Sequence, residues 1–342
     1  MDTLTIKLKE QSYDVTIRMN SLQQFAELQK DHLTRADRVG IVVDETVYPL
    51  YGERLERSLQ DEEIDVSVFV VPKGEKAKTM DVYQRAQSFF LQRQFTRNSL
   101  LIAFGGGAVG DLTAFIAATF MRGIPFIQLP TTILAHDSAV GGKTAINMPE
   151  GKNMVGAFHQ PKAVLFDPLL FKTLPEREWR SGMAELLKHA YISDDEWTKQ
   201  LLRDQAFIRP SLDVLASRLL KGVQVKAKIV EADTYEKGSR KFLNFGHTFG
   251  HAIEAATDFG AYSHGECIMI GMGYALLLSE MKGQIASNQT DQLIRFAKSQ
   301  GYSFDPIFQY DFEQLFAYMA TDKKVSFGQI HFVILRQIGK PE

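Results

Sequence analysis

The sequence has one cysteine, little net charge and no long apolar run, and each of these absences removes a class of protein. The single cysteine, Cys267, excludes an intramolecular disulfide and fits a reducing compartment. A formal net charge of −2 gives no electrostatic reason to expect nucleic acid or an anionic membrane as a partner. The most apolar stretches are broken by charge or glycine before the ~18 residues that a membrane-spanning helix needs. The first ten residues alternate polar and apolar and include Asp2, unlike a signal peptide. We therefore expect a cytoplasmic protein that binds neither nucleic acid nor membrane.

The composition is that of a globular protein large enough for two domains. The chain has 342 residues, of which 45% are hydrophobic and 23% charged. The first half alternates short β-branched runs with segments of helical spacing, a pattern typical of a parallel sheet covered on both faces. The strands that we expect are Leu4–Leu8, Tyr13–Arg18, Val39–Val43, Val66–Val71, Leu100–Phe104, Phe126–Leu129 and Ala163–Phe166, the first two as a hairpin.

The second half is predicted to be almost entirely helical. Helices are expected at Thr79–Gln94 and Asp111–Arg122, and then at Glu176–Tyr191, Trp197–Leu202, Leu212–Glu231, His247–Ala256, Glu266–Lys282 and Thr290–Ser299. A last strand is expected at Ile330–Leu335. We predict an α/β domain with a mostly parallel, Rossmann-like sheet over residues 1–167, an all-α domain over residues 168–342, and a cleft between them.

A triple glycine joins a predicted strand to a predicted helix. Gly105, Gly106 and Gly107 stand before Ala108-Val-Gly-Asp111, which is not the G-x-G-x-x-G fingerprint. Glycines at such a turn allow a pyrophosphate to approach the helix N-terminus closely, whereas the plainer interpretation is a tight turn without a ligand. Acidic and basic residues at other strand ends favour a dinucleotide, and these are Asp44, Glu75 and Lys78.

Thr131 and Thr132 also follow a strand, at the edge of the sheet where open α/β folds bind ligands. The stretch Gly141-Gly-Lys143-Thr144 resembles the end of a P-loop, but the first glycine of that motif is replaced by Asp137. A Walker-type ATPase is therefore not expected. Lys143 and Lys152, each beside glycine, suit an oxyanion, although either lysine alone is as easily a solvated loop residue.

Three of the eight histidines lie between positions 247 and 264, and they raise the question of a metal. His247 and His251 share one face of a predicted helix, and His264 follows in Ser263-His-Gly-Glu266. Upstream, Glu185 and Lys188 share a face of another helix. Two histidines with one carboxylate form a common catalytic zinc set. The residues alone also allow a set of His247, His251 and His264 that leaves Glu185 outside.

Cations accompany these motifs in a slightly acidic protein, which suggests a substrate with more than one negative charge, such as a phosphate and a carboxylate. They are Arg122, Lys143, Lys152, Lys188, Lys226, Arg240 and one of Lys323 or Lys324.

Taken in order, these motifs resemble the 3-dehydroquinate synthase family from about Asp44 to Leu335. Nine ordered stretches carry the resemblance: Gly105-Gly-Gly-Ala-Val-Gly-Asp111, Met121-Arg-Gly123, Pro130-Thr-Thr132, Asp137-Ser-Ala-Val-Gly-Gly-Lys143, Gly151-Lys-Asn153, Gly182-Met-Ala-Glu-Leu-Leu-Lys188, Leu243-Asn-Phe-Gly-His-Thr-Phe-Gly-His251, His264-Gly-Glu266 and Asp322-Lys-Lys324. Two features depart from the family pattern. The segment before Asp137 is one residue shorter than the commoner form, and Cys267 stands where alanine is common. We interpret Cys267 as a packing residue.

The resemblance implies an NAD-binding α/β domain, a helical domain, Zn²⁺ or Co²⁺, and a homodimer. It implies 3-deoxy-D-arabino-heptulosonate 7-phosphate as the substrate, an anionic sugar phosphate that is converted to 3-dehydroquinate and phosphate. By the same resemblance the metal ligands are Glu185, His247 and His264. The implied NAD-binding residues are Asp44, Glu75, Lys78, Gly105, Gly106, Gly107, Asp111, Thr131, Thr132, Lys143, Lys152 and Thr173.

The resemblance also assigns residues to the substrate. Lys152, Asn153, His251 and, from the neighbouring subunit, Arg122 are implied at the phosphate, with His251 also handling protons. Lys188, Lys226, Arg240 and Asn244 are implied at the carboxylate and hydroxyls. Asp137 and Lys143 are implied at the metal-proximal end, and Lys324 completes the implied catalytic set.

Other functions compete with this one. Another sugar phosphate cyclase, such as a 2-deoxy-scyllo-inosose or 2-epi-5-epi-valiolone synthase, would share the metal and NAD residues. A polyol dehydrogenase of the glycerol dehydrogenase type would share the layout but has no use for so many cations. A nucleotide-sensing module without catalysis would not need Glu185 or His264.

Overall fold

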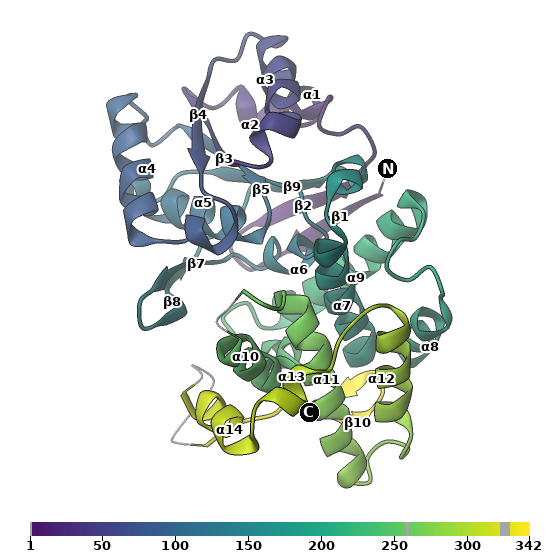
Figure 1. Cartoon of the computed structure of the whole chain (residues 1–342). Coiled ribbons are helices and arrows are strands. Elements are labelled where there is room, and N and C mark those ends of the chain that lie inside the picture. The colour runs from purple at the N-terminus through teal and green to yellow at the C-terminus, as the bar shows by residue number, and fades with distance from the viewer. Residues whose placement is uncertain (1, 258–259, 322–328) are drawn as a thin grey trace. The chain divides into compact units, whose positions relative to one another are not determined.

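The computed structural model describes residues 2–257, 260–321 and 329–342, and Figure 1 traces the chain through them. The chain divides into two compact units. The first comprises residues 1–173 and 215–227, and the second comprises residues 174–214 and 228–342. The expected division after residue 167 used one boundary, whereas the compact units also assign residues 215–227 to the first unit. In the described residues, no helix combines the length and the apolarity that crossing a membrane requires.

The first unit is built on a seven-stranded sheet in the order β1-β2-β9-β6-β5-β3-β4. Strands β1 and β2 form an antiparallel hairpin, and every other pairing is parallel. The strands are β1 Asp2–Lys7, β2 Ser12–Ile17, β3 Val39–Asp44, β4 Val66–Val71, β5 Leu100–Gly105, β6 Phe126–Pro130 and β9 Ala163–Phe166. The seven predicted strands and the predicted opening hairpin are therefore confirmed.

Helices cover both faces of this sheet, as Figure 1 shows. Alternation along β3 explains the two cores, because Val42 packs on one side, whereas Ile41 and Val43 pack on the other. The helices of the first face are α4 Met80–Gln92 and α5 Gly107–Thr119. Those of the second face are α1 Phe25–Leu28, α2 Lys30–Leu33 and α3 Glu53–Gln60. The short helix α6 Ala135–Ser138 follows β6.

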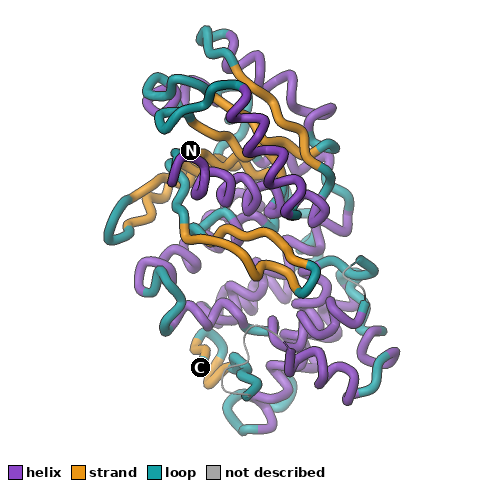
Figure 2. Tube along the Cα trace, turned by 90° about the vertical axis from the view of Figure 1, so that its left-hand side faces the viewer, coloured by secondary structure: helices purple, strands orange, loops and turns teal. Residues whose placement is uncertain are grey.

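A second antiparallel hairpin of the first unit is a structural feature that the sequence did not predict. It consists of β7 Lys143–Met148 and β8 Gly151–Phe158, which pair with each other and not with the main sheet. In Figure 2 it is visible as a separate pair of strands. Strand β7 packs against α5, so the hairpin lies beside that helix.

The second unit is helical apart from one short strand pair. Its helices are α7 Glu176–Ser193, α8 Asp195–Arg203, the ends of α9 Leu212–Ala232, α10 His247–Ala256, α11 His264–Met281, α12 Gln289–Ser299, α13 Pro306–Gln309 and α14 Phe312–Thr321. Helix α11 packs against α7, α10 and α12. The predicted strand Ile330–Leu335 is wrong except at its last residue. Strand β10 is Leu335–Gln337, paired with β11 Lys340–Pro341. Val333 and Ile334 are buried before this strand, and Ile334 exchanges two backbone hydrogen bonds with Glu342, at 3.1 and 2.9 Å.

Candidate metal centre and nucleotide-binding turn

Three helices of the second unit bring a carboxylate and two imidazoles together. Glu185 lies fully buried in the middle of α7, and His247 and His264 are the first residues of α10 and α11. The Glu185 Oε1 atom is 3.8 Å from Nε2 of His247 and 3.5 Å from Nε2 of His264. One donor atom from each residue lies within 4.8 Å of the other two. This geometry suits a small cation, which would draw the three donors inward.

The far side of each imidazole is held by an oxygen acceptor. Nδ1 of His247 lies 3.2 Å from the Phe245 carbonyl oxygen, and Nδ1 of His264 lies 3.3 Å from Oε2 of Glu254. A carbonyl or carboxylate oxygen only accepts, so the proton of each ring belongs on Nδ1. The Nε2 lone pairs then face Glu185, which is the arrangement of histidines that bind a metal. The donor set fits Zn²⁺ or Co²⁺.

Charge in this centre is balanced before any metal is considered. Lys188, one turn after Glu185 on α7, forms an ion pair with Glu185 Oε2, and both side chains are fully buried. Burial alone would lower the pKa of His264. Its hydrogen bonds to Glu185 and Glu254 outweigh burial and raise that pKa to about 9. A proton and a metal ion therefore compete for the same imidazole.

Glycines let α10 and α11 approach closely enough to bring their histidines together. Gly246, the residue before α10, has a φ of 80°, a conformation that L side chains rarely adopt. A Cβ on Gly271 of α11 would lie 1.9 Å from the Gly246 carbonyl oxygen. A Cβ on Gly250 would lie 2.9 Å from the Cys267 carbonyl oxygen. The glycines beside the two histidines in Asn244–His251 thus serve helix packing.

His251 stands beside the three donors rather than among them. Its ring centroid is 5.4 Å from that of His247 and 5.8 Å from that of His264. A second possible metal group joins His251, Glu254 and His264. Sequence reasoning missed Glu254, although its position three residues after His251 on the same helix was a readable signal.

Two further predicted residues occupy the 3₁₀ turn Ser239–Asn244, which leads into α10. Arg240 is buried, and its guanidinium donates to the Thr234 carbonyl oxygen. The side-chain amide of Asn244 donates to Glu236 at 3.3 Å. Lys323 and Lys324 lie outside the described residues.

In the first unit, the triple glycine forms the turn from β5 into α5. Gly106 is the N-cap of α5 in an extended conformation, with no side chain capping the helix. Two hydroxyls flank this turn, because a Cβ on Gly106 would lie 3.0 Å from Thr132 Cγ2 and one on Gly107 would lie 2.8 Å from Ser138 Oγ. Within the described part of the chain, neither Thr132 Oγ1 nor Ser138 Oγ has a hydrogen-bond partner, although both atoms are buried. Open N–H groups and buried hydroxyls at one helix start fit a pyrophosphate. Ser138 was not predicted.

A polar network beside this turn joins predicted cofactor and substrate residues. Lys78 is buried, and its Nζ lies 2.6 Å from Asp111 Oδ2 and donates to Asn153 Oδ1. Glu75 Oε2 accepts from the side-chain amide of Asn147 at 2.6 Å, and Asn147 Oδ1 accepts from the Asn153 backbone N–H at 3.0 Å. Burial raises the pKa of Asp111, and the Lys78 ammonium opposes that rise.

Other predicted residues of this unit lie at strand ends. Asp44 ends β3 and accepts from the Thr46 backbone N–H at 2.7 Å. Thr131 follows β6 and donates its backbone N–H to the Gly105 carbonyl oxygen at 2.9 Å. Lys226 lies 3.1 Å from Asp137 Oδ1. Lys143 is exposed at the start of β7, and Lys152 is partly exposed on β8.

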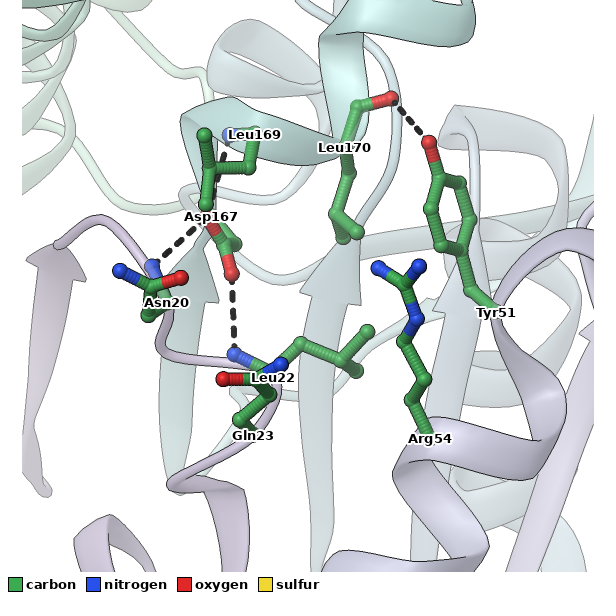
Figure 3. A pocket seen from close by; sticks show the side chains of 8 residues that line it. All are labelled: Asn20, Leu22, Gln23, Tyr51, Arg54, Asp167, Leu169 and Leu170. Carbon is green, nitrogen blue, oxygen red and sulfur yellow. Dashed lines mark hydrogen bonds between the residues drawn. The ribbon is translucent and has the colours of Figure 1, made fainter.

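Thr173 lies beside a small cavity of the first unit. Its hydroxyl is 2.8 Å from that of Tyr51. The cavity, about 30 Å³, is large enough for one water molecule. Figure 3 shows its lining, in which Asp167 accepts backbone N–H groups from Asn20, Leu22 and Leu169 while Tyr51 donates to the Leu170 carbonyl oxygen.

Comparison with solved structures defines the class of protein. A 2-deoxy-scyllo-inosose synthase, solved with carbaglucose-6-phosphate, NAD⁺ and Co²⁺, matches with a TM-score of 0.88 at 25% identity, covering 100% of this chain and 94% of that one. ValA, the 2-epi-5-epi-valiolone synthase of Streptomyces hygroscopicus subsp. jinggangensis 5008, solved with NAD⁺ and Zn²⁺, matches with a TM-score of 0.87 at 28% identity, covering 98% and 93%. The fold is that of the sugar phosphate cyclases, as predicted.

Sequence comparison identifies the family. The model of the 3-dehydroquinate synthase N-terminal domain matches residues 68–181, and that of the C-terminal domain matches residues 182–325. A 3-dehydroquinate synthase of Lysinibacillus sphaericus is 48% identical over 336 residues, covering 98% of this chain and 92% of the relative. The chain belongs to the 3-dehydroquinate synthase family.

Proposed function

We propose that this chain converts 3-deoxy-D-arabino-heptulosonate 7-phosphate to 3-dehydroquinate and phosphate, with NAD⁺ and Zn²⁺ or Co²⁺ bound, as a cytoplasmic homodimer. Family membership supports the reaction, and the named relatives and the ligands of the cyclase structures support the cofactors. The observation that carries the metal assignment is the convergence of Nε2 of His247 and His264 on Glu185, with each Nδ1 held by an oxygen.

In this proposal Glu185, His247 and His264 hold the metal, which when bound supplies a Lewis acid that stabilises negative charge on a substrate oxygen. Lys188 forms a buried ion pair with Glu185 and so offsets the negative charge of this proposed ligand. His251, whose ring packs beside His247, exchanges a proton with the substrate while phosphate departs.

The turn between β5 and α5 holds the dinucleotide, which when bound supplies a hydride acceptor that is regenerated within each turnover. The N–H groups of Gly106 and Gly107 and the hydroxyls of Thr132 and Ser138 bind the pyrophosphate. Asp44 binds a ribose hydroxyl. The remaining proposed contacts are Glu75, Lys78, Gly105, Asp111, Thr131, Lys143, Lys152 and Thr173.

Substrate recognition is divided among the cations. Lys188, Lys226, Arg240 and Asn244 are assigned to the carboxylate and hydroxyls, Lys152 and Asn153 to the phosphate, and Asp137, Lys143 and Lys324 to the remaining substrate contacts. All three of Lys188, Lys226 and Arg240 are buried. Two of them already lie in ion pairs, Lys188 with Glu185 and Lys226 with Asp137, so the proposed substrate carboxylate would join these charged groups.

Arg122 is proposed to act in the neighbouring subunit of the homodimer. It follows Met121 and precedes Gly123, and the three residues have φ values of 49°, 70° and 120°. Two consecutive non-glycine residues in this region carry strain of roughly 1–3 kcal/mol each. Both side chains are exposed, so the strained turn presents Arg122 outward. Backbone strain at an exposed turn supports a function for that turn, and we propose that this function is contact with the neighbouring subunit.

Phosphate release tests the proposed reaction. Protein stripped of metal with a chelator should release no phosphate from the heptulosonate phosphate, and addition of Zn²⁺ or Co²⁺ should restore release without net accumulation of NADH. Net NADH formation would instead indicate a polyol dehydrogenase.

A second candidate is another sugar phosphate cyclase, which the fold match favours as much as the first. Glucose 6-phosphate and sedoheptulose 7-phosphate lack a carboxylate, whereas the buried cations suit one. Parallel assays with the three sugar phosphates separate the candidates, and release only from a substrate without a carboxylate would overturn our proposal.

A further inference from the structure

The two metal-ligand helices of the second unit are joined near the candidate centre by a set of contacts outside it. We infer that Arg180 and Glu266 are positioning residues, which fix the first turn of α11, and with it His264, against α7, which carries Glu185. The inference rests on the proposed metal centre. It concerns an arginine and a glutamate that have no place among the proposed ligands or substrate contacts.

The first contact is a capping box at the start of α11. The Ser263 hydroxyl oxygen accepts from the Glu266 backbone N–H at 3.4 Å, and Glu266 Oε2 accepts from the Ser263 backbone N–H at 2.8 Å. The Ser263 hydroxyl also donates to Glu266 Oε2 at 2.8 Å. His264 lies between these two residues, so the box sets the backbone conformation from which its imidazole projects.

The second contact ties the other carboxylate oxygen of Glu266 to α7. Nε of Arg180 lies 3.0 Å from Glu266 Oε1, and the two side chains are only 19% and 11% exposed. The arginine is itself held, because its Nη1 lies 2.8 Å from Glu176 and its carbonyl oxygen accepts from the Tyr302 hydroxyl at 2.6 Å. Arg177 reaches the same carboxylate less closely, at 3.7 Å, and is more exposed.

The third contact is a close approach of the two backbones between these side chains. The Gly265 backbone N–H donates to Ser181 Oγ at 3.1 Å. A Cβ on Gly265 would lie 2.0 Å from the Ser181 carbonyl oxygen, so only glycine allows this approach. Three consecutive residues of α11 therefore face α7. His264 is the candidate ligand beside Glu185, Gly265 makes the backbone contact with Ser181, and Glu266 forms the ion pair with Arg180.

These contacts act on the distance that a metal requires. Glu185 lies about 1.4 turns after Arg180 on α7, and its Oε1 is 3.5 Å from Nε2 of His264. Because both oxygens of Glu266 are occupied by the capping box and by Arg180, its carboxylate serves α11 and α7 rather than an ion. Loss of the Arg180–Glu266 ion pair would let the first turn of α11, which carries His264, move relative to Glu185. The affinity for the metal would then fall although all three proposed ligands remain.

The test measures Co²⁺ binding, by competition with a chromophoric chelator and by the visible absorption of bound Co²⁺, on the full chain without substrate. Glu266→Gln keeps an amide oxygen for the Ser263 N–H but loses the charge that attracts Arg180. Arg180→Met loses the ion pair from the other side. We expect each substitution to weaken Co²⁺ binding by about 10–100-fold. The double variant should bind Co²⁺ no more weakly than whichever single variant has the lower affinity. Arg180→Lys should recover part of the loss.

Lys199→Met is the matched control, because it removes an exposed ion pair within α8, between Lys199 and Asp195. It should bind Co²⁺ like the parent chain. Thermal unfolding of each metal-free variant checks that the fold persists. Unchanged Co²⁺ affinity and absorption in folded Arg180→Met and Glu266→Gln would overturn the inference, as would a parent chain that binds no Co²⁺. A parent chain that binds Co²⁺ yet releases no phosphate from the heptulosonate phosphate would refute the proposed reaction and leave the positioning result intact.

Discussion

The proposed nucleotide-binding turn of the first unit and the proposed metal centre of the second would recognise their ligands with different parts of the chain. The turn offers main-chain N–H groups at the start of α5, where its glycines carry no side chains that would block a ligand. The candidate metal centre offers three side chains from three helices, each in contact with its own neighbours. A main-chain site depends on local backbone conformation, whereas a side-chain site depends on how whole helices pack. Substitutions should therefore affect the two regions in different ways.

Removal of a metal donor should have the largest effect on activity. Glu185→Gln or His264→Ala should abolish stoichiometric Zn²⁺ binding and lower kcat by roughly 10³-fold, because a bound cation contributes several kcal/mol to transition-state stabilisation. Metal content by atomic spectroscopy and phosphate release check this. His32→Ala, in the first unit, is the control and should keep both properties. A Glu185→Gln protein with full metal content and full rate would remove Glu185 from the centre.

Loss of the buried lysine beside the nucleotide turn should act on stability. Lys78→Met leaves Asp111 without its ammonium partner and should lower the free energy of unfolding by about 3 kcal/mol at neutral pH. Burial raises the pKa of Asp111, so its proton is taken up more readily in the folded than in the unfolded chain. The deficit should therefore shrink as the pH falls and the carboxyl becomes neutral. Urea titrations of both proteins across the acid range measure it, and a deficit that grows on acidification would contradict the explanation.

The sequence predicted the sheet well, because buried parallel strands are continuous β-branched runs whatever surrounds them. It missed one hairpin and misplaced one strand. The β7–β8 hairpin lies in a stretch without clear alternation of polar and apolar residues, so period-two patterning does not reveal its two strands. Ile330–Leu335 has the apolar pattern of a strand, yet the strand β10 begins only at Leu335, and of the residues before it Ile334 pairs with Glu342 through two backbone hydrogen bonds.

For the candidate site, residue types were readable from the sequence but their supporting contacts were largely not. Histidine spacing and the family resemblance singled out Glu185, His247 and His264. The residues alone left His251 as an alternative ligand, because one helix face carries both His247 and His251. Only the packing of α7 against α11 brings Glu185 to the histidines. Glu254 and Ser138 were missed because their importance comes from contacts that only the fold creates. Glu254 contacts Nδ1 of His264, and the Ser138 hydroxyl lies beside Gly107.

Glu254 tests whether the metal centre depends on support behind its ligands. Glu254→Ala removes the acceptor for Nδ1 of His264 and should weaken metal binding by about 10–100-fold while leaving all three ligands in place. Glu254→Gln retains an oxygen acceptor and should lose less. Chelator competition measures both variants. Equal affinities for Glu254→Ala and the parent chain would show that the ring of His264 needs no such partner.

The smallest effect is expected at the cysteine of α11. Cys267 is buried three residues after His264, outside the groups of donors that could hold a metal in the described chain. Cys267→Ala should keep metal affinity and activity and lower the free energy of unfolding by about 1 kcal/mol through lost packing. A tenfold loss of Zn²⁺ affinity with an unchanged melting temperature would make the thiol a ligand.

The location of the metal is the most direct test of the proposed centre. An anomalous difference map from crystals grown with Zn²⁺ should show one strong peak in the second unit, about 2.0–2.2 Å from a Glu185 carboxylate oxygen and from Nε2 of His247 and His264. A peak bound instead by His251, Glu254 and His264, or no peak at Glu185 in protein that needs Zn²⁺ for turnover, would contradict the proposed centre.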